Sequence, residues 1–386
     1  MEKPHEIALA FPRGGHLEVL IEGVLDYVRE KELNWCYITA LESRTMSLLD
    51  LVDWPGDGIL AAINTKEEAA CAASHSIPIV NVSSALPDPP VPSCVIDNQA
   101  IGDLAADHLI GKGFRSYGYL GLKEVEYSRQ RQQGFAAKLE AAGFTCCDFL
   151  SYPTYHLKGS DWLRQNHDLA EWLEGLNKPL GLFAVSDYRA RQALDACRLV
   201  GLKVPEEIAI VGMGNEELVC EHVYPTITSI VRNNHLQGYR SAELLHSLMD
   251  GIELDVDLHT IAPLDIIERE STSTFAVTDE RLREALEFLH DNLHSSTFSI
   301  DDVTREAGVS RRWLEYAFRD ALGEAPYQYL RRQRLALARR LLVEEPKRKI
   351  YAIAQSSGFS SAKQLAMTFQ QDLGMSPREY RRAAQS

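Results

Sequence analysis

Residues 350–369 read IYAIAQSSGFSSAKQLAMTF, a stretch with the parts of two short helices joined by a tight turn. Gly358 can adopt the positive φ that such a turn needs, and Ser361 can cap the helix that follows. Ala354, four residues before the glycine, is small enough to let the two helices approach closely. The pattern predicts a helix-turn-helix whose second helix enters the major groove of DNA.

The same arrangement occurs fifty residues earlier, in SIDDVTREAGVSRRWLEYAF at 299–318. Gly308 takes the place of the turn glycine and Ser310 the place of the capping serine, while the bulkier Thr304 replaces the alanine. A long helix with many arginines is expected between the units, over 326–345. One such turn is weak evidence, but two in register with a connecting helix strongly predict a DNA-reading domain.

The region 279–386 resembles the DNA-binding domain of the AraC/XylS family, most specifically in SGFSS at 357–361 and GMSPREYRR at 374–382. The alternative is a helical bundle that binds no DNA. The resemblance implies DNA contacts by Ser310, Arg311, Arg312, Glu315 and Tyr316 in the first unit, and by Ser361, Ala362, Lys363, Ala366 and Met367 in the second. Arg312 could bind a guanine edge and Glu315 could accept from a cytosine, whereas Arg311 and the two serines suit phosphates.

The charge distribution agrees with a DNA-binding tail. The chain carries a net charge of −15, yet from Phe275 onward it contains 18 Lys and Arg residues and 15 Asp and Glu residues. That part is therefore +3 and the rest −18. We expect only the C-terminal part to meet double-stranded DNA.

The residues before the tail alternate between short β-branched runs and helical patterns, which is typical of a doubly wound α/β fold with parallel strands. Strands are predicted at 6–11, 58–63, 78–82, 116–121, 181–186 and 208–213. The segment around 269–278 is polar and without periodicity. The predicted division is a two-lobed sensor domain over 1–268, a linker over 269–278 and an all-α domain over 279–386.

The order of VIDNQAIGDLAADHLIGKGF at 95–114, an arginine three residues before Gly134, and GLKVPEEIAIVGMGNEE at 201–217 resembles the effector domain of the LacI/GalR family. The resemblance implies a sugar-type ligand between two lobes, with xylose or a related pentose or sugar derivative as the first candidate. Polar groups at the carboxyl ends of parallel strands suit such a ligand. The matching ligand positions are His16, Asp97, Asn98, Arg131, Asp187, Asn215 and Arg232.

Simpler roles are open for several of these residues. Asp97 and Asp187 could cap helices, Arg131 could form a surface ion pair, and His16 could be an ordinary exposed residue. Gly214 stands where the family usually has an aspartate, and Arg232 where relatives often have a glutamine. Together these differences favour an anionic sugar, a sugar acid or a phosphosugar, as an alternative ligand.

Other functions have little support in the sequence. No GxGxxG follows the first strand, and there is no Walker A, GxSxG or HExxH motif, so we expect neither an enzyme nor a cofactor. The seven scattered cysteines predict no metal site and are expected to be reduced and mostly buried. With no signal-like start and no long apolar run, a cytoplasmic protein that contacts no membrane is expected.

The expected mechanism is that ligand closes the lobes of a homodimer and changes the pose of its DNA-binding domains. The resemblance implies activation through RNA polymerase. Two rival hypotheses are a constitutive DNA-binding protein whose front domain only dimerises, and a transport-type binding protein with an added helical domain.

Overall fold

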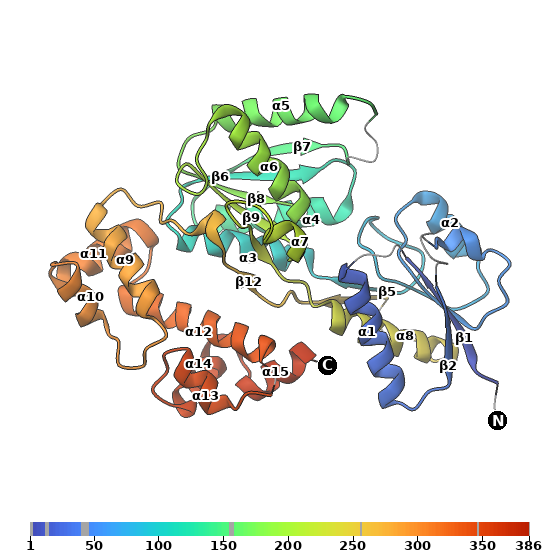
Figure 1. Cartoon of the computed structure of the whole chain (residues 1–386). Coiled ribbons are helices and arrows are strands. Elements are labelled where there is room, and N and C mark those ends of the chain that lie inside the picture. Colours follow the sequence, from blue (N-terminus) through green and yellow to red (C-terminus); the bar gives the residue numbers. More distant parts are fainter. Residues whose placement is uncertain are drawn as a thin grey trace.

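The computed structural model describes residues 3–11, 15–39, 46–153, 158–254, 257–345 and 347–385. Two α/β lobes are followed by a helical domain, coloured orange to red in Figure 1. Each lobe is built on its own six-stranded, mainly parallel sheet. The expected fold class, a two-lobed sensor with doubly wound sheets plus an all-α domain, is confirmed.

Lobe 1 has the strand order β11-β5-β4-β3-β1-β2, and all its described pairs are parallel. The strands are β1 (His5–Ala10), β2 (Trp35–Ile38), β3 (Gly58–Ala61), β4 (Ile79–Asn81), β5 (Ser93–Ile96) and β11 (Leu258–Ile261). Its helices are α1 (Gly15–Glu30), η1 (Leu48–Leu51), α2 (Lys66–Ser74) and α8 (Asn234–Met249).

Lobe 2 has the strand order β12-β10-β9-β8-β6-β7, and only the pair of β10 and β12 is antiparallel among those described. The strands are β6 (Ser116–Leu122), β7 (Cys146–Ser151), β8 (Leu180–Ala184), β9 (Ile208–Met213), β10 (Thr228–Ile230) and β12 (Ile266–Ile267). Its helices are α3 (Asn98–Gly111), α4 (Glu126–Ala141), α5 (Asp161–Gly175), α6 (Asp187–Val200), α7 (Glu217–Cys220) and η3 (Glu270–Thr272).

The six predicted strands correspond to β1, β3, β4, β6, β8 and β9, which lie at the centres of the two sheets. Most of their residues are buried on both faces, so each strand contains a largely apolar run. The missed edge strands β2 and β7 are partly exposed, and β10 and β12 have only three and two residues. Short or half-exposed strands leave little pattern in a sequence.

The chain crosses between the lobes three times. The crossings follow β5, β10 and β11, and we call them hinge 1 (residues 96–98), hinge 2 (230–234) and hinge 3 (261–266). Backbone hydrogen bonds join neighbouring hinges. Asp97 N donates to Ile261 O over 2.8 Å, Val231 N donates to Asp265 O over 2.8 Å, and Leu264 N donates to Val231 O over 2.9 Å. The three crossings therefore form one connected unit.

The helical domain contains α9 (Glu280–Asn292), α10 (Ile300–Glu306), α11 (Arg311–Leu322), α12 (Pro326–Glu344), α13 (Ile350–Ser356), α14 (Ala362–Leu373) and α15 (Pro377–Gln385). Helices α10 and α11 form the first predicted helix-turn-helix, and α13 and α14 form the second. Helix α12 contacts α11 on one side and α13 and α14 on the other, so it holds the two units apart as expected (Figure 1).

Both turn glycines have positive φ, 62° at Gly308 and 77° at Gly358. Their surroundings differ. A Cβ at Gly358 would lie 2.1 Å from Leu293 O, whereas a Cβ at Gly308 would meet nothing within 4 Å. The second unit is pressed against the end of α9, while the first turn is open to solvent.

The segment predicted as the linker, 269–278, packs against lobe 2. Ser271 and Thr272 are fully buried, and Phe275 is 4% exposed. Ser271 Oγ donates to Ile210 O over 2.6 Å, and Ala276 N donates to Lys112 O over 2.8 Å. These contacts place the start of the helical domain firmly beside α3.

Charged and aromatic side chains join lobe 2 to the helical domain. Lys112, 4% exposed, forms an ion pair with Glu268 and lies 4.5 Å from the centre of the Phe275 ring. His108 Nε2 and Thr272 Oγ1 are 2.9 Å apart. Burial lowers the pKa of His108 to about 4, and it does the same for His290 of α9. Both histidines are therefore neutral near pH 7.

The cysteines differ from expectation, since only Cys94, Cys197 and Cys220 are buried. All seven are unpaired. In the described part of the chain, no cluster of three or more His, Cys, Asp or Glu suits a metal ion. None of the described helices combines the length and apolarity needed to cross a membrane.

Gly358→Ala should destabilise the helical domain far more than Gly308→Ala. The φ cost is about 1–2 kcal/mol at either site, and the clash with Leu293 adds roughly 1–3 kcal/mol at Gly358 alone. Urea denaturation of the two variants measures the difference. Equal losses would contradict the packing of the second turn.

Acidification should loosen the contact between lobe 2 and the helical domain. Because folding depresses the pKa of His108 and His290 to about 4, their contribution is complete above the unfolded value, about 6.5, and is lost as pH falls toward 4. Neighbouring Glu268 favours protonation of both, and Lys112 and Arg332 oppose it. His108→Gln should flatten the fall in melting temperature between pH 6.5 and 4.5, and the exposed His222→Gln should not. An unchanged slope in His108→Gln would refute this account.

Candidate effector cleft and DNA interface

A cleft of about 360 Å³ lies between the two lobes. Lobe 1 contributes Asn64 and Ser83, and lobe 2 contributes Tyr127 and Glu216. Four of the seven predicted ligand residues also line it, namely Asn98, Arg131, Asp187 and Arg232. A larger space of about 820 Å³ lies elsewhere, between lobe 2 and helices of the C-terminal domain. Of these two spaces, the smaller one is lined by described residues of both lobes and of hinge 2.

Arg131 is held rigidly in the wall of the cleft, with 6% of its side chain exposed. Its Nε donates to Asn98 Oδ1 over 2.9 Å, and its Nη1 donates to Val185 O over 2.6 Å. The guanidinium carbon lies 4.8 Å from the centre of the Tyr127 ring. Burial, and then the nearby charge of Arg232, lower the pKa of Arg131 to about 10. The guanidinium still carries its charge at neutral pH.

Two glycines explain why Arg131 reaches Asn98. A Cβ at Gly134 would lie 2.1 Å from Gln99 O, and a Cβ at Gly102 would lie 2.3 Å from Arg131 O. Helices α3 and α4 therefore touch along their backbones. This close approach aligns the start of α3, where Asn98 lies, with the middle of α4.

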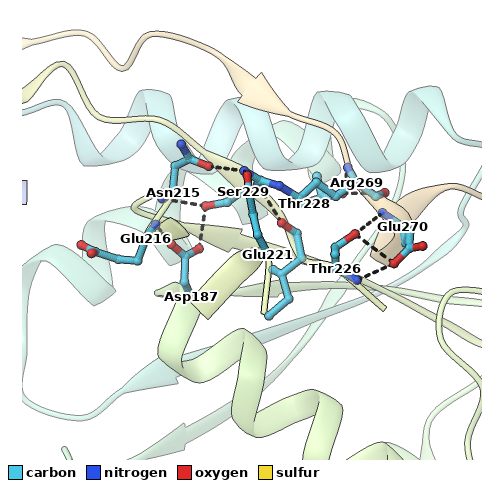
Figure 2. Close-up of polar contacts among 10 residues, drawn as sticks. Asp187, Asn215, Glu216, Glu221, Thr226, Thr228, Ser229, Arg269 and Glu270 are labelled. Atoms are coloured by element: carbon cyan, nitrogen blue, oxygen red, sulfur yellow. Dashed lines mark hydrogen bonds and ion pairs between the residues drawn. The ribbon is translucent and has the colours of Figure 1, made fainter. Parts of the chain in front are cut away.

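Asp187 is completely buried at the start of α6 and stabilises the loop after β9. Its Oδ1 accepts from Ser229 Oγ over 2.6 Å, and its Oδ2 accepts from Glu216 N over 2.8 Å. Burial raises the pKa of this carboxyl, and the bond from Ser229 opposes the rise. Figure 2 shows the carboxylate between the loop and β10.

Arg232 extends from hinge 2 toward the same loop. Its Nη2 lies 3.9 Å from Glu216 Oε1, and its buried Nε has no hydrogen-bond partner among the residues that the structure describes. Gly214, with φ 128°, has no side chain to fill the space beside it. A Cβ there would lie 3.1 Å from Asp187 Oδ2 and 3.4 Å from Arg232 Nη2.

The other three predicted ligand residues are not among those that line the cleft. Asp97 caps α3 by accepting from Ala100 N over 2.9 Å, which is the alternative role considered above. Asn215 turns away, and its Oδ1 accepts from Arg269 Nη2 over 2.9 Å (Figure 2). His16 lies outside the residues whose side chains the structure describes. The ligand roles of all seven stay predictions.

Sequence reasoning missed Tyr127 and Glu216. Tyr127 lies four residues before Arg131, on the same face of α4, so helical spacing could have found it. Glu216 is next to the predicted Asn215, and only the direction of the loop decides which of the two faces the cleft.

The first predicted DNA-reading helix presents its expected residues to solvent. Ser310 caps α11 by accepting from Trp313 N over 3.2 Å. Arg311, Arg312 and Tyr316 are exposed, and Glu315 is half-buried. Arg311 also pairs with Asp301 of α10 over 2.8 Å, a contact that would open if Arg311 bound a phosphate.

The second helix is capped in the same way, since Ser361 Oγ accepts from Gln364 N over 3.2 Å. Lys363 and Met367 are exposed, while Ala362 and Ala366 are half-buried. The buried side of α14 carries Leu365 and Phe369. Both reading helices thus turn an apolar face inward and the predicted contact face outward.

Comparisons with known proteins agree with this architecture. Residues 106–272 match the family described as periplasmic binding protein-like domain, and residues 303–383 match a helix-turn-helix domain. An AraC-like transcription regulator of Streptomyces antibioticus is 37% identical over 107 residues, which span 28% of this chain and 34% of that protein.

Longer matches cover nearly the whole chain. The xylose operon regulatory protein of Escherichia coli (strain K12) is 28% identical, with 98% of this chain and 97% of that protein covered. Its counterpart in Haemophilus influenzae is 26% identical, with 98% and 99% covered. A solved structure of a xylose-binding transcription activator has a TM-score of 0.63 at 27% identity, with 98% of both chains covered. The chain is therefore a DNA-binding transcription regulator in which a periplasmic binding protein-like sensor precedes an AraC-type helix-turn-helix domain.

Proposed function

We propose that a sugar bound in the cleft between the lobes controls how this regulator holds its DNA-reading helices. Xylose or a related pentose or sugar derivative is the first candidate, because the long relatives are named for xylose regulation. The observation that carries the proposal is that hinges 2 and 3, joined by backbone hydrogen bonds, lie between the cleft and the DNA-binding domain. The protein would bind the sugar and release it chemically unchanged.

The connection begins at hinge 2. Arg232 lines the cleft, and Val231 beside it exchanges backbone hydrogen bonds with Leu264 and Asp265 of hinge 3. A ligand that moves Arg232 therefore acts directly on hinge 3.

The helical domain contacts the other side of hinge 3. Tyr380 Oη of α15 donates to Leu264 O over 3.4 Å, and so does Arg339 Nη2 of α12. Arg339 Nε lies 4.0 Å from Asp265 Oδ2 and donates to Tyr380 Oη over 3.1 Å. Burial raises the pKa of Asp265, and the charge of Arg339 opposes the rise.

The helical domain also touches both lobes. Helix α15 packs on α8 of lobe 1, while Arg115 of lobe 2 donates to Asp320 O of α11. A rotation of one lobe against the other cannot preserve both sets of contacts, because the helical domain would have to follow two bodies at once. Closure on a ligand should therefore change the pose of α11 and α14.

We further propose that the active form is a homodimer that binds an operator in the cytoplasm and activates transcription through RNA polymerase. A dimer with two helix-turn-helix pairs would read repeated half-sites. The alternative is a constitutive DNA-binding protein whose sensor domain only dimerises, and ligand titration discriminates between them.

Arg312→Ala should weaken binding to the specific operator by about 5- to 100-fold, since a bidentate base contact contributes roughly 1–3 kcal/mol. Binding to unrelated DNA should change little. Electrophoretic titration with promoter fragments from the protein's own genomic neighbourhood measures both, with Arg240→Ala on the exposed side of α8 as the control. Equal losses on specific and unrelated DNA would show that Arg312 reads no base.

Ligand should shift the operator affinity of the wild-type protein by about fivefold or more, the usual range of allosteric coupling. Arg339→Ala and the milder Tyr380→Phe should reduce this shift, because they cut the contacts with hinge 3. The control is Arg331→Ala on the same helix, whose partner Asp372 lies within the helical domain.

Ligand affinity itself should stay within about threefold in all three variants. If saturating ligand leaves operator binding of the wild type unchanged in affinity and pattern, the proposed function fails. If the shift persists in full in Arg339→Ala and Tyr380→Phe, coupling runs by another route.

A further inference from the structure

The chemistry of the cleft bears on the class of ligand, and the inference rests on the function proposed above. Two arginines line the cleft from different elements, Arg131 from α4 and Arg232 from hinge 2. They are close enough for the charge of Arg232 to lower the pKa of Arg131. Two like charges in one cleft call for a counter-charge.

Arg131 has only neutral hydrogen-bond partners among the described residues. Its bonds go to the amide oxygen of Asn98 and to the backbone carbonyl of Val185. A guanidinium with 6% of its side chain exposed is costly to bury unless an anion lies close by.

The positive charge of Arg232 is only partly balanced by nearby negative charge. Glu216 lies 3.9 Å from Arg232 Nη2, at the outer limit of an ion pair. The buried Nε of Arg232 has no acceptor within the described part of the chain. An N–H donor buried without a partner is rare in native structures and marks a place where a ligand atom can bind.

Asp187 cannot act as the missing counter-ion by direct contact. Its two oxygens already accept from Ser229 Oγ and Glu216 N, and its side chain is wholly buried. A carboxylate engaged in this way stabilises the loop. Among the described contacts it makes no hydrogen bond or ion pair with either arginine, and its charge acts on them only over a longer distance.

Gly214 lies beside Arg232 but has no side chain that could pair with it. A Cβ there would lie 3.4 Å from Arg232 Nη2. Residue 214 therefore brings no carboxylate of its own to Arg232.

We propose that the cleft binds a sugar-sized ligand carrying a carboxylate or phosphate, and that this anionic group lies on Arg131 and Arg232. Arg131 belongs to lobe 2 and Arg232 to hinge 2. Lobe 1 contributes the neutral side chains of Asn64 and Ser83, which are 2.7 Å apart. The ligand is therefore oriented with its hydroxyls toward lobe 1. A cleft of about 360 Å³ suits a pentose with one acidic group.

Calorimetric titration of the full chain with D-xylose, D-xylonate and D-xylose 5-phosphate tests the proposal. At least one acid should bind about tenfold or more tightly than xylose, as expected for charge-assisted bonds. Its affinity should fall between 50 and 300 mM salt while that of xylose stays constant. The two acids also distinguish a carboxylate site from a phosphate site.

Arg232→Gln should remove about tenfold of the affinity for the preferred acid and change that for xylose by less than about threefold. Arg232→Lys keeps the charge and should retain part of the preference. Arg191→Gln, at an exposed ion pair with Asp195, should leave all three affinities unchanged. Melting temperatures of the variants separate lost binding from lost folding.

Tighter binding of neutral xylose than of both acids would overturn the anionic assignment and leave the sugar-responsive function standing. An acid preference that survives in Arg232→Gln would also overturn it, because the charge would then act elsewhere. If none of the three compounds binds or alters operator binding, both the assignment and the proposed function fail.

Discussion

The structure depends on the backbone hydrogen bonds that tie hinge 2 to hinge 3, in which Val231 pairs with Leu264 and Asp265. On one side of this pair Arg232 faces the cleft, and on the other Arg339 and Tyr380 belong to the DNA-binding domain. Because these two hydrogen bonds would have to break for one segment to slide past the other, a movement of hinge 2 also moves hinge 3. Hinges 2 and 3 therefore connect the two lobes of the sensor, and hinge 3 also provides the surface against which the DNA-binding domain packs.

Two of the buried charged groups have clear structural partners, and two arginines line the cleft. Lys112 is compensated by Glu268 at the domain interface, and Asp187 by two donors in its loop. Arg131 and Arg232 differ because their surroundings are neutral or incompletely paired. The overall charge of −15 hides these local balances, and it also hides the mildly basic C-terminal region.

Close backbone contacts explain how several helices are positioned relative to one another. Gly102 and Gly134 bring α3 against α4 and so bring Asn98 to Arg131, and Gly358 brings the second reading unit against the end of α9. In each case a Cβ would lie only 2.1 to 2.3 Å from a backbone oxygen, too close for any side chain to fit. The glycine three residues after Arg131 therefore lets α3 approach α4 closely enough for Arg131 to reach Asn98, and this is visible only when both helices are considered.

The sequence by itself determined the two-lobed fold, the six central strands, the paired turns around Gly308 and Gly358, and four residues that do line the cleft: Asn98, Arg131, Asp187 and Arg232. The strands and the turns follow from local periodicity, capping and turn chemistry, which act over a few residues. The two lobes and the four cleft residues were implied by the resemblance to the LacI/GalR effector domain. Only the tertiary structure decided that Asp97 caps a helix, that Asn215 turns to Arg269 while Glu216 faces the cleft, and that Arg339 and Tyr380 contact hinge 3. The capping by Asp97 is local and was one of two roles that the sequence left open. The other outcomes depend on loop direction and on contacts between residues more than fifty positions apart, which no local pattern encodes.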